Sequence, residues 1–246
     1  MLDDVFETAW GRIRVKGRLG QQHADVLEAI LRSGQKPKEL GDGRIKLLVD
    51  PAEVRRMARQ PSTSTFHQVR DELMQALIEI IEPVRLAGVG HLIDHIDFAR
   101  RPDGQFIVAA NPLGGERHLW RVDLGKALCK LIDVDLWVHR DPAPIAALRH
   151  GISQAVARHV LSHKRGSCSA WTIDTLIHAV SGELSSQQLW DRRTELRADR
   201  AALAALGVTW SESPRPWSKS PPPWSKSSTP GAKAGQAQVI QASQEA

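Results

Sequence analysis

Residues 153–210 read SQAVARHVLSHKRGSCSAWTIDTLIHAVSGELSSQQLWDRRTELRADRAALAALGVTW, and this stretch is the most informative in the chain. Its pattern predicts a packing helix, a short helix and a turn, a long helix with a polar face, and then a strand. Ser185 and Gln188 have the spacing of a capping box, which opens the long helix, and Gly207 is a typical stop. This order of elements is typical of a winged helix.

The first half of the chain repeats the same order. Alternating apolar and basic residues in 11–17 predict a strand with a basic face, and the residues at 44–49 predict another. Asp50 and Pro51 are a favourable start for a short helix that ends near Arg59. The remaining expected elements are a long helix capped by Ser62 or Ser64 and ending at Ile81, a hairpin over 84–98, and a strand over 105–109.

The sequence therefore predicts an α+β protein of two tandem winged-helix domains with a disordered C-terminal tail. The turn-forming residues Asn111–Gly115 favour a boundary between a domain over 1–112 and a domain over 113–210. Residues 211–246 are rich in Pro, Ser and Trp and contain the PWSKS repeat, a composition too poor in apolar residues to form a core. The alternative for this tail is a peptide that docks on a partner through its tryptophans.

The charge of the chain favours an anionic partner. The 246 residues carry a net charge of +5, and the sequence pI is about 9.5. The two cysteines are typical of reduced thiols in the cytosol, and neither a signal peptide nor an apolar run of about 20 residues is present. We therefore expect a cytoplasmic protein with no membrane partner.

Polar and basic residues near the start of each long helix are candidates for contacts with double-stranded DNA, because such a helix end can enter the major groove. The alternative is an amphipathic surface helix whose polar face meets water. Leu189, Leu196 and Leu203 repeat every seven residues and form a leucine stripe, and Arg193 lies close enough to this stripe to cover the core instead of contacting DNA. A basic turn beside the first wing adds two further candidates. The candidates are Ser62, Thr63, Ser64, Thr65, His67, Gln68, Arg70, Arg100, Arg101, Ser185, Ser186, Gln187, Gln188, Arg192, Arg193 and Arg197.

Enzymatic function is not expected. The chain has no glycine-rich phosphate loop and no nucleophile elbow, and it contains no tyrosine, the usual nucleophile of nicking enzymes that start rolling-circle replication. The histidines and acidic residues at 91–97 are better explained as one strand of the first wing than as metal ligands. We expect no catalytic residue, no metal and no cofactor.

Four segments carry a resemblance to a known family. These are AVARHVL at 155–161, KRG at 164–166, TIDTL at 172–176 and FIVAANP at 106–112. The first three resemble the C-terminal winged helix of plasmid replication initiators, in particular those of broad-host-range plasmids, and the fourth is similar to the strand that ends their first winged helix. The likeness is specific over only about 60 residues.

The resemblance implies a bacterial cytoplasmic protein that binds repeated sites, called iterons, at a plasmid origin of replication. It implies recruitment of a host replication initiator and of the replicative helicase without nucleotide hydrolysis, and a monomer–dimer equilibrium. The chain departs from the family in its short second wing and in its Trp/Pro tail. Two alternatives stay open, because a fold does not determine a function. They are a winged-helix transcriptional regulator and a module that binds protein instead of DNA.

Overall fold

The structure is a computed structural model that describes residues 3–8, 11–60, 62–82, 87–111, 114–133, 141–163 and 171–212. All of them fall within one compact unit, residues 1–214. The predicted tail lies outside the described residues except for Ser211 and Glu212. The sequence also predicts a strand over 136–139, and these residues lie outside the described ranges as well. The mixture of helices and strands confirms the α+β class.

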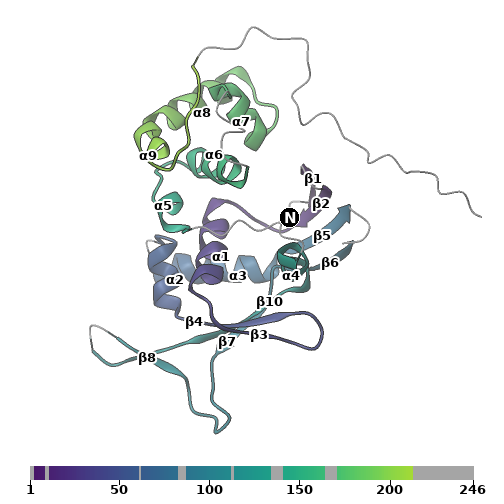
Figure 1. The fold of residues 1–246 in the computed structure, drawn as a ribbon, viewed down its shortest axis with the longest axis vertical. Coiled ribbons are helices and arrows are strands. Elements are labelled where there is room, and N and C mark those ends of the chain that lie inside the picture. The colour runs from purple at the N-terminus through teal and green to yellow at the C-terminus, as the bar shows by residue number, and fades with distance from the viewer. Residues whose placement is uncertain are drawn as a thin grey trace, which may run out of the picture. The chain divides into compact units, whose positions relative to one another are not determined.

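The described strands form two four-stranded antiparallel sheets and one two-stranded ribbon, and the hairpin that contains β8 extends beyond the end of the sheet that contains β4 and β7 in Figure 1. The orders are β1-β2-β5-β6, β3-β4-β10-β7 and β8-β9. The strands are β1 (Asp3–Thr8), β2 (Gly11–Lys16), β3 (Gln35–Glu39), β4 (Ile45–Val49), β5 (Leu77–Glu82), β6 (Gly88–His91), β7 (Ile93–Phe98), β8 (Val108–Ala110), β9 (Glu116–His118) and β10 (Trp120–Leu124).

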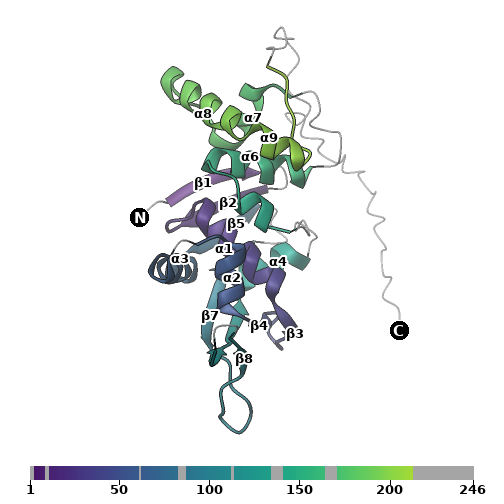
Figure 2. The same ribbon diagram turned by 90° about the vertical axis from the view of Figure 1, so that its left-hand side faces the viewer.

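Helices α1, α2 and α3 pack on the sheet that contains β4, β10 and β7, and helices α6 to α9 form a separate group (Figures 1 and 2). Each group has its own hydrophobic core. The helices are α1 (Gln21–Ser33), α2 (Pro51–Met57), α3 (Thr63–Gln75), α4 (Lys126–Asp133), α5 (Ala143–Ala146), α6 (Gly151–Ser162), α7 (Ile173–Ser181), α8 (Ser186–Ala198) and α9 (Arg200–Ala205).

Helix α3 ends at Gln75, so the prediction that it reaches Ile81 is wrong. Ala76 has an extended backbone, with φ −68° and ψ 129°, and the next six residues form strand β5. Ile78 and Ile80 are buried in alternation, and β5 pairs with both β2 and β6. The apolar residues at 77–81 fit the spacing of a helix as well as the alternation of a strand. Pairing with two neighbouring strands decided in favour of the strand.

The first hydrophobic core extends beyond the expected boundary at residue 112. Strand β10 lies between β4 and β7, and its Trp120 and Val122 are buried in that core together with Leu128 of α4. The close approach at Gly125 ties α4 to β6, because a Cβ there would lie 1.9 Å from the carbonyl oxygen of His91. The second core begins with Ile145, so the two cores divide after α4.

The second core is built from helices and a returning chain segment. Leu196 and Leu203 are fully buried, and Leu189 packs against them, as the seven-residue spacing predicts. Val208 and Trp210 are buried in the same core, and Ser211 forms an isolated parallel bridge with Thr172. The strand expected at 208–210 is therefore absent from the described residues, and the assignment of two winged helices stays a prediction.

One ion-pair network joins the helices of the two cores. Arg158 of α6 contacts Asp25 at 2.5 Å and Glu28 at 3.1 Å, and it donates a third hydrogen bond to Gln21 at 2.6 Å. All three acceptors belong to α1. Burial raises the pKa of Asp25 above its ordinary value, and the charge of Arg158 opposes that shift. The network therefore surrounds one guanidinium with three side chains of α1 and offsets part of the cost of burying Asp25.

We expect Arg158→Ala to lower the free energy of unfolding by about 3 kcal/mol near pH 7, because removing one partner leaves buried charges unpaired. An aspartate with a raised pKa holds its proton in the folded state at a pH where the unfolded chain has lost it, so its contribution to stability falls as pH rises. Without Arg158 the pKa of Asp25 rises further, and the destabilisation should shrink as the pH is lowered toward 4. Urea unfolding at several pH values measures both effects.

The matched control is Arg149→Ala, which removes an exposed arginine just before α6 and should change stability by no more than about 0.5 kcal/mol. Equal losses in the two variants would show that the network does not hold α6 on α1.

Candidate nucleic-acid interface

The first turn of α3 is built from hydroxyl side chains that cap the helix. The Ser62 hydroxyl accepts a hydrogen bond from the Thr65 amide at 3.1 Å and lies 3.0 Å from the Ser64 hydroxyl. Thr63 and Ser64 are exposed. The free amides of a helix N-terminus carry partial positive charge, so exposed hydroxyls beside them form a site that suits a phosphate group.

The later candidates on α3 are less available for a ligand. Arg70 is half-buried, pairs with Asp71 at 2.6 Å and lies over the ring of Trp120. His67 is also half-buried and packs against the same indole. Gln68 is exposed, although its amide donates to Glu72 at 2.9 Å. Contact with Trp120 therefore holds Arg70 and His67 against the protein beneath α3. Among the candidates on α3, Gln68 and two residues of the first turn are exposed to a ligand.

Three arginines of the preceding segment were missed by the sequence reasoning. Arg55 and Arg56 on α2, and Arg59 just after it, are all exposed, and the Arg55 guanidinium donates to the Thr63 hydroxyl at 2.6 Å. The helical spacing of PAEVRRMAR places these arginines opposite Val54 and the other buried residues of α2, a signal that was available in the sequence. They add positive charge beside the N-terminus of α3.

The turn after β7 carries the two predicted wing arginines. Arg100 donates to the carbonyl oxygen of Gly104 at 3.0 Å, and its guanidinium lies 3.9 Å from the centre of the Phe106 ring. Arg101 is exposed, and its amide closes the turn on Gln105. The stacking on Phe106 orders Arg100 without neutralising it, so a charged group remains on the hairpin.

The basic face expected on β2 is paired with acidic residues of its neighbour. Arg12 lies 3.0 Å from Glu82, and Arg14 lies 2.6 Å from Glu79, both across β2 and β5. These pairs compensate the positive charge of the strand, so β2 is a weak candidate for contacts with DNA phosphates.

The N-terminus of α8 has the capping box that the sequence predicts. The Ser185 hydroxyl accepts from the Gln188 amide at 3.3 Å, and the Gln188 side chain accepts from the Ser185 amide at 2.9 Å. Ser186 and Gln187 are exposed in the same turn, and Gln187 donates to Asp191 at 3.1 Å. Ser185 and Gln188 thus have a structural role, and Ser186 and Gln187 face solvent.

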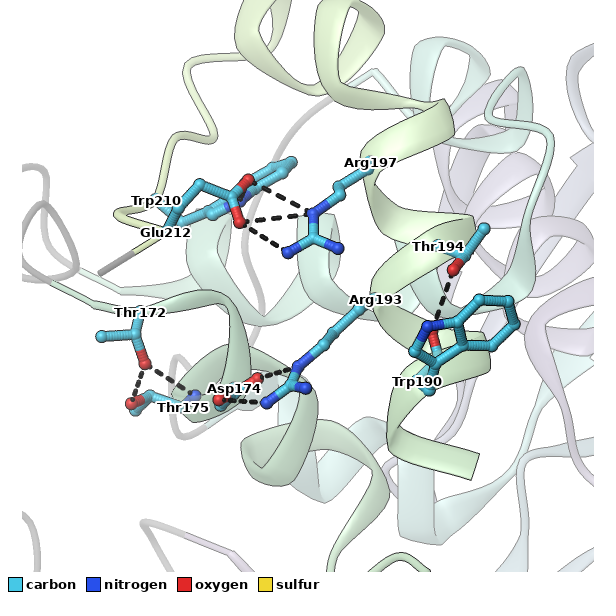
Figure 3. Close-up of polar contacts among 9 residues, drawn as sticks. All are labelled: Thr172, Asp174, Thr175, Trp190, Arg193, Thr194, Arg197, Trp210 and Glu212. Atoms are coloured by element: carbon cyan, nitrogen blue, oxygen red, sulfur yellow. Dashed lines mark hydrogen bonds and ion pairs between the residues drawn. The ribbon is translucent and has the colours of Figure 1, made fainter. Parts of the chain in front are cut away.

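Two predicted arginines of α8 turn toward neighbouring carboxylates (Figure 3). Arg193 donates to both oxygens of Asp174 on α7, at 2.6 and 2.7 Å, and Arg197 lies 2.8 Å from Glu212. The hydrogen bond from Arg193 lowers the pKa of Asp174, and the one from Arg197 lowers the pKa of Glu212. Arg193 therefore joins α7 to α8, while Arg197 remains about half exposed.

Arg192 and Trp190 lie on the exposed part of α8. Arg192 forms an ion pair with Glu195 one turn along, at 2.8 Å, and its side chain is 45% exposed, so this pair costs little to break. Trp190 is 59% exposed, and the sequence reasoning did not include it. The signal for Trp190 was its position in the helix away from the leucine stripe.

No protein-family model matches the chain, and no curated protein sequence matches it. Two similar solved structures are crystal structures of domains 2 and 3 of RctB. The first, of selenomethionine derivatives, has 10% identity and a TM-score of 0.50 over 80% of this chain and 77% of that chain. The second has 9% identity and a TM-score of 0.48 over 80% and 76%. The first likeness shows a shared fold.

The described residues do not form a metal site or a membrane span. They contain no group of three or more His, Cys, Asp or Glu side chains that could hold a metal ion, and none of their helices is long and apolar enough to cross a bilayer. The DNA-contact roles of the residues described above stay predictions.

Arg59 provides a test that separates stability from binding. Its φ is +49°, a left-handed conformation that costs a non-glycine residue about 1 kcal/mol. We expect Arg59→Gly to raise the free energy of unfolding by up to about 1 kcal/mol, because glycine adopts this conformation freely, and to weaken binding to duplex DNA. Urea unfolding and fluorescence anisotropy with a labelled duplex measure the two effects.

Lys36→Gly is the matched control, since Lys36 has a φ of +50° and also carries one positive charge. It should stabilise the protein without weakening DNA binding. If both variants bind DNA as the parent does, Arg59 does not belong to the interface.

Proposed function

We propose that this protein initiates plasmid replication by sequence-specific binding of double-stranded DNA at repeated origin sites. The observation that carries the proposal is the pair of capped helices, α3 and α8, each of which follows a short helix and begins with exposed polar residues. The sequence resemblance to plasmid initiators supports it. The fold likeness to domains 2 and 3 of RctB, a replication initiator, also supports an initiator role.

The charge distribution near α3 supports binding to the DNA backbone. Three exposed arginines of the α2 segment accompany the exposed residues Thr63 and Ser64, and Arg100 adds a cation on the hairpin. Guanidinium groups and helix N-termini are the groups with which proteins hold DNA phosphates. In this proposal, α2 and the hairpin fix the register of the protein, and the first turn of α3 meets the duplex.

The two helix pairs suggest a division of each binding site into two parts. One part would be read by α3 and the other by α8, where Gln187 can bind adenine and Arg192 or Arg197 can bind guanine or phosphate. A protein of this kind melts DNA through binding energy and recruits other proteins, so the proposal includes no enzymatic step. Its proposed partners are the origin repeats, a host replication initiator and the replicative helicase, with a monomer–dimer equilibrium.

We expect Arg192→Ala and Arg197→Ala each to weaken DNA binding several-fold. Each lost phosphate contact should lower the slope of log K against log salt by about 0.9. Arg193→Ala should instead act mainly on stability, because Arg193 is held by Asp174. Gel shifts with the DNA that flanks the gene, over a series of salt concentrations, measure these effects.

Two controls accompany this experiment. Lys36→Ala removes one charge from the exposed strand β3 and should leave the salt slope unchanged, and Trp217→Ala, in the predicted tail, should not affect affinity. Wild-type binding that does not depend on salt would overturn the proposal. Successive footprints on direct repeats support an initiator, whereas a single footprint on a palindrome supports the transcriptional regulator.

A further inference from the structure

The exposed face of α8 carries one large apolar side chain. Trp190 is 59% exposed and does not belong to the second hydrophobic core, although Leu189 beside it packs against that core. Among the described residues, the indole makes no ring contact with another aromatic side chain or with a guanidinium. An indole that stays in water loses the favourable free energy that its burial would provide. Nothing in the described fold therefore explains a tryptophan at this position.

The arginines and the tryptophan of α8 point in different directions. Arg193 and Arg197 follow Trp190 by three and seven residues, so all three side chains leave the same half of the helix. The two guanidinium groups bend to Asp174 and Glu212, away from the indole (Figure 3). Thr194, one turn beyond Trp190, donates its hydroxyl to the carbonyl oxygen of Trp190 at 3.0 Å. The hydroxyl is therefore occupied within the helix, and this level of α8 offers mainly an apolar surface to a ligand.

The position of Trp190 is suited to a helix that enters a major groove. It lies in the second turn of α8, and Gln187, which is exposed, precedes it by nearly one turn. The methyl group of thymine is the apolar feature that base pairs present in the major groove, and proteins recognise it through apolar side chains. A duplex bound at α8 would therefore meet hydrogen-bonding groups first and the indole next.

We propose that Trp190 is a specificity-determining residue that packs against the methyl group of a thymine in the bound site. The inference rests on the proposed function, because it requires that α8 reads duplex DNA. It goes beyond that function by assigning the recognition of one base to an apolar contact rather than to an arginine. The expected ligand at this position is an A·T base pair with its thymine methyl facing α8.

The experiment uses the full chain and duplexes in which single thymines are replaced by uracil, which lacks only the methyl group. The preferred site is first selected from a library of random duplexes. At one thymine, the replacement should weaken binding of the wild-type protein about fourfold, the factor expected for one buried group of this size. Trp190→Ala should bind the thymine duplex more weakly and show no difference between thymine and uracil, whereas Trp190→Phe should keep the difference.

The outcomes separate this inference from the proposed function. If the wild-type protein selects no duplex from the library, the proposed function fails and this inference fails with it. If the wild-type protein selects a site but Trp190→Ala keeps the full uracil penalty at every thymine, DNA reading stands and the role of Trp190 is wrong. Circular dichroism checks that the variants are folded, which is expected for a substitution at an exposed position.

Discussion

The structure depends most on the buried ion-pair network at Arg158, where the helices of the two cores meet. One guanidinium serves two carboxylates and an amide on α1, and removal of that cation would leave these groups without their shared partner in a region of low solvent access. Apolar contacts tolerate small shifts, but such a network requires one arrangement of donors and acceptors. The relation between α1 and α6 therefore has a specific electrostatic reason.

Electrostatics also divides the basic residues into two kinds. Arg193 and Arg197 are paired with Asp174 and Glu212, whereas the arginines of the α2 segment are exposed beside the start of α3, where Arg56 has a long ion pair of 4.0 Å with Glu53. An arginine with a protein partner must exchange that partner for a phosphate, so its net contribution to binding is smaller than that of an open one. In the proposed complex, the first helix pair would supply most of the attraction to the backbone, and α8 would contribute more through shape and apolar contact.

Sequence reasoning succeeded where a local rule was sufficient. The caps at Ser62, one of two candidates, and at Ser185 were identified because a capping side chain bonds only a few residues away. It failed at β5 and at 208–210, because the partners that determine these segments lie far along the chain. Of the candidate site, it found the two polar helix starts but missed the arginines of α2, whose helical spacing was visible, and Trp190.

The sequence by itself determined the α+β class, the cap of α8 and the common buried face of Leu189, Leu196 and Leu203, since these follow from local patterns along the chain. The tertiary structure alone decided that β10 completes the first core, that Trp120 draws Arg70 inward, and that Asp174 and Glu212 engage two arginines of α8. The physical reason is that a charged or apolar side chain takes its role from the groups it meets, and these come from segments that only folding brings together.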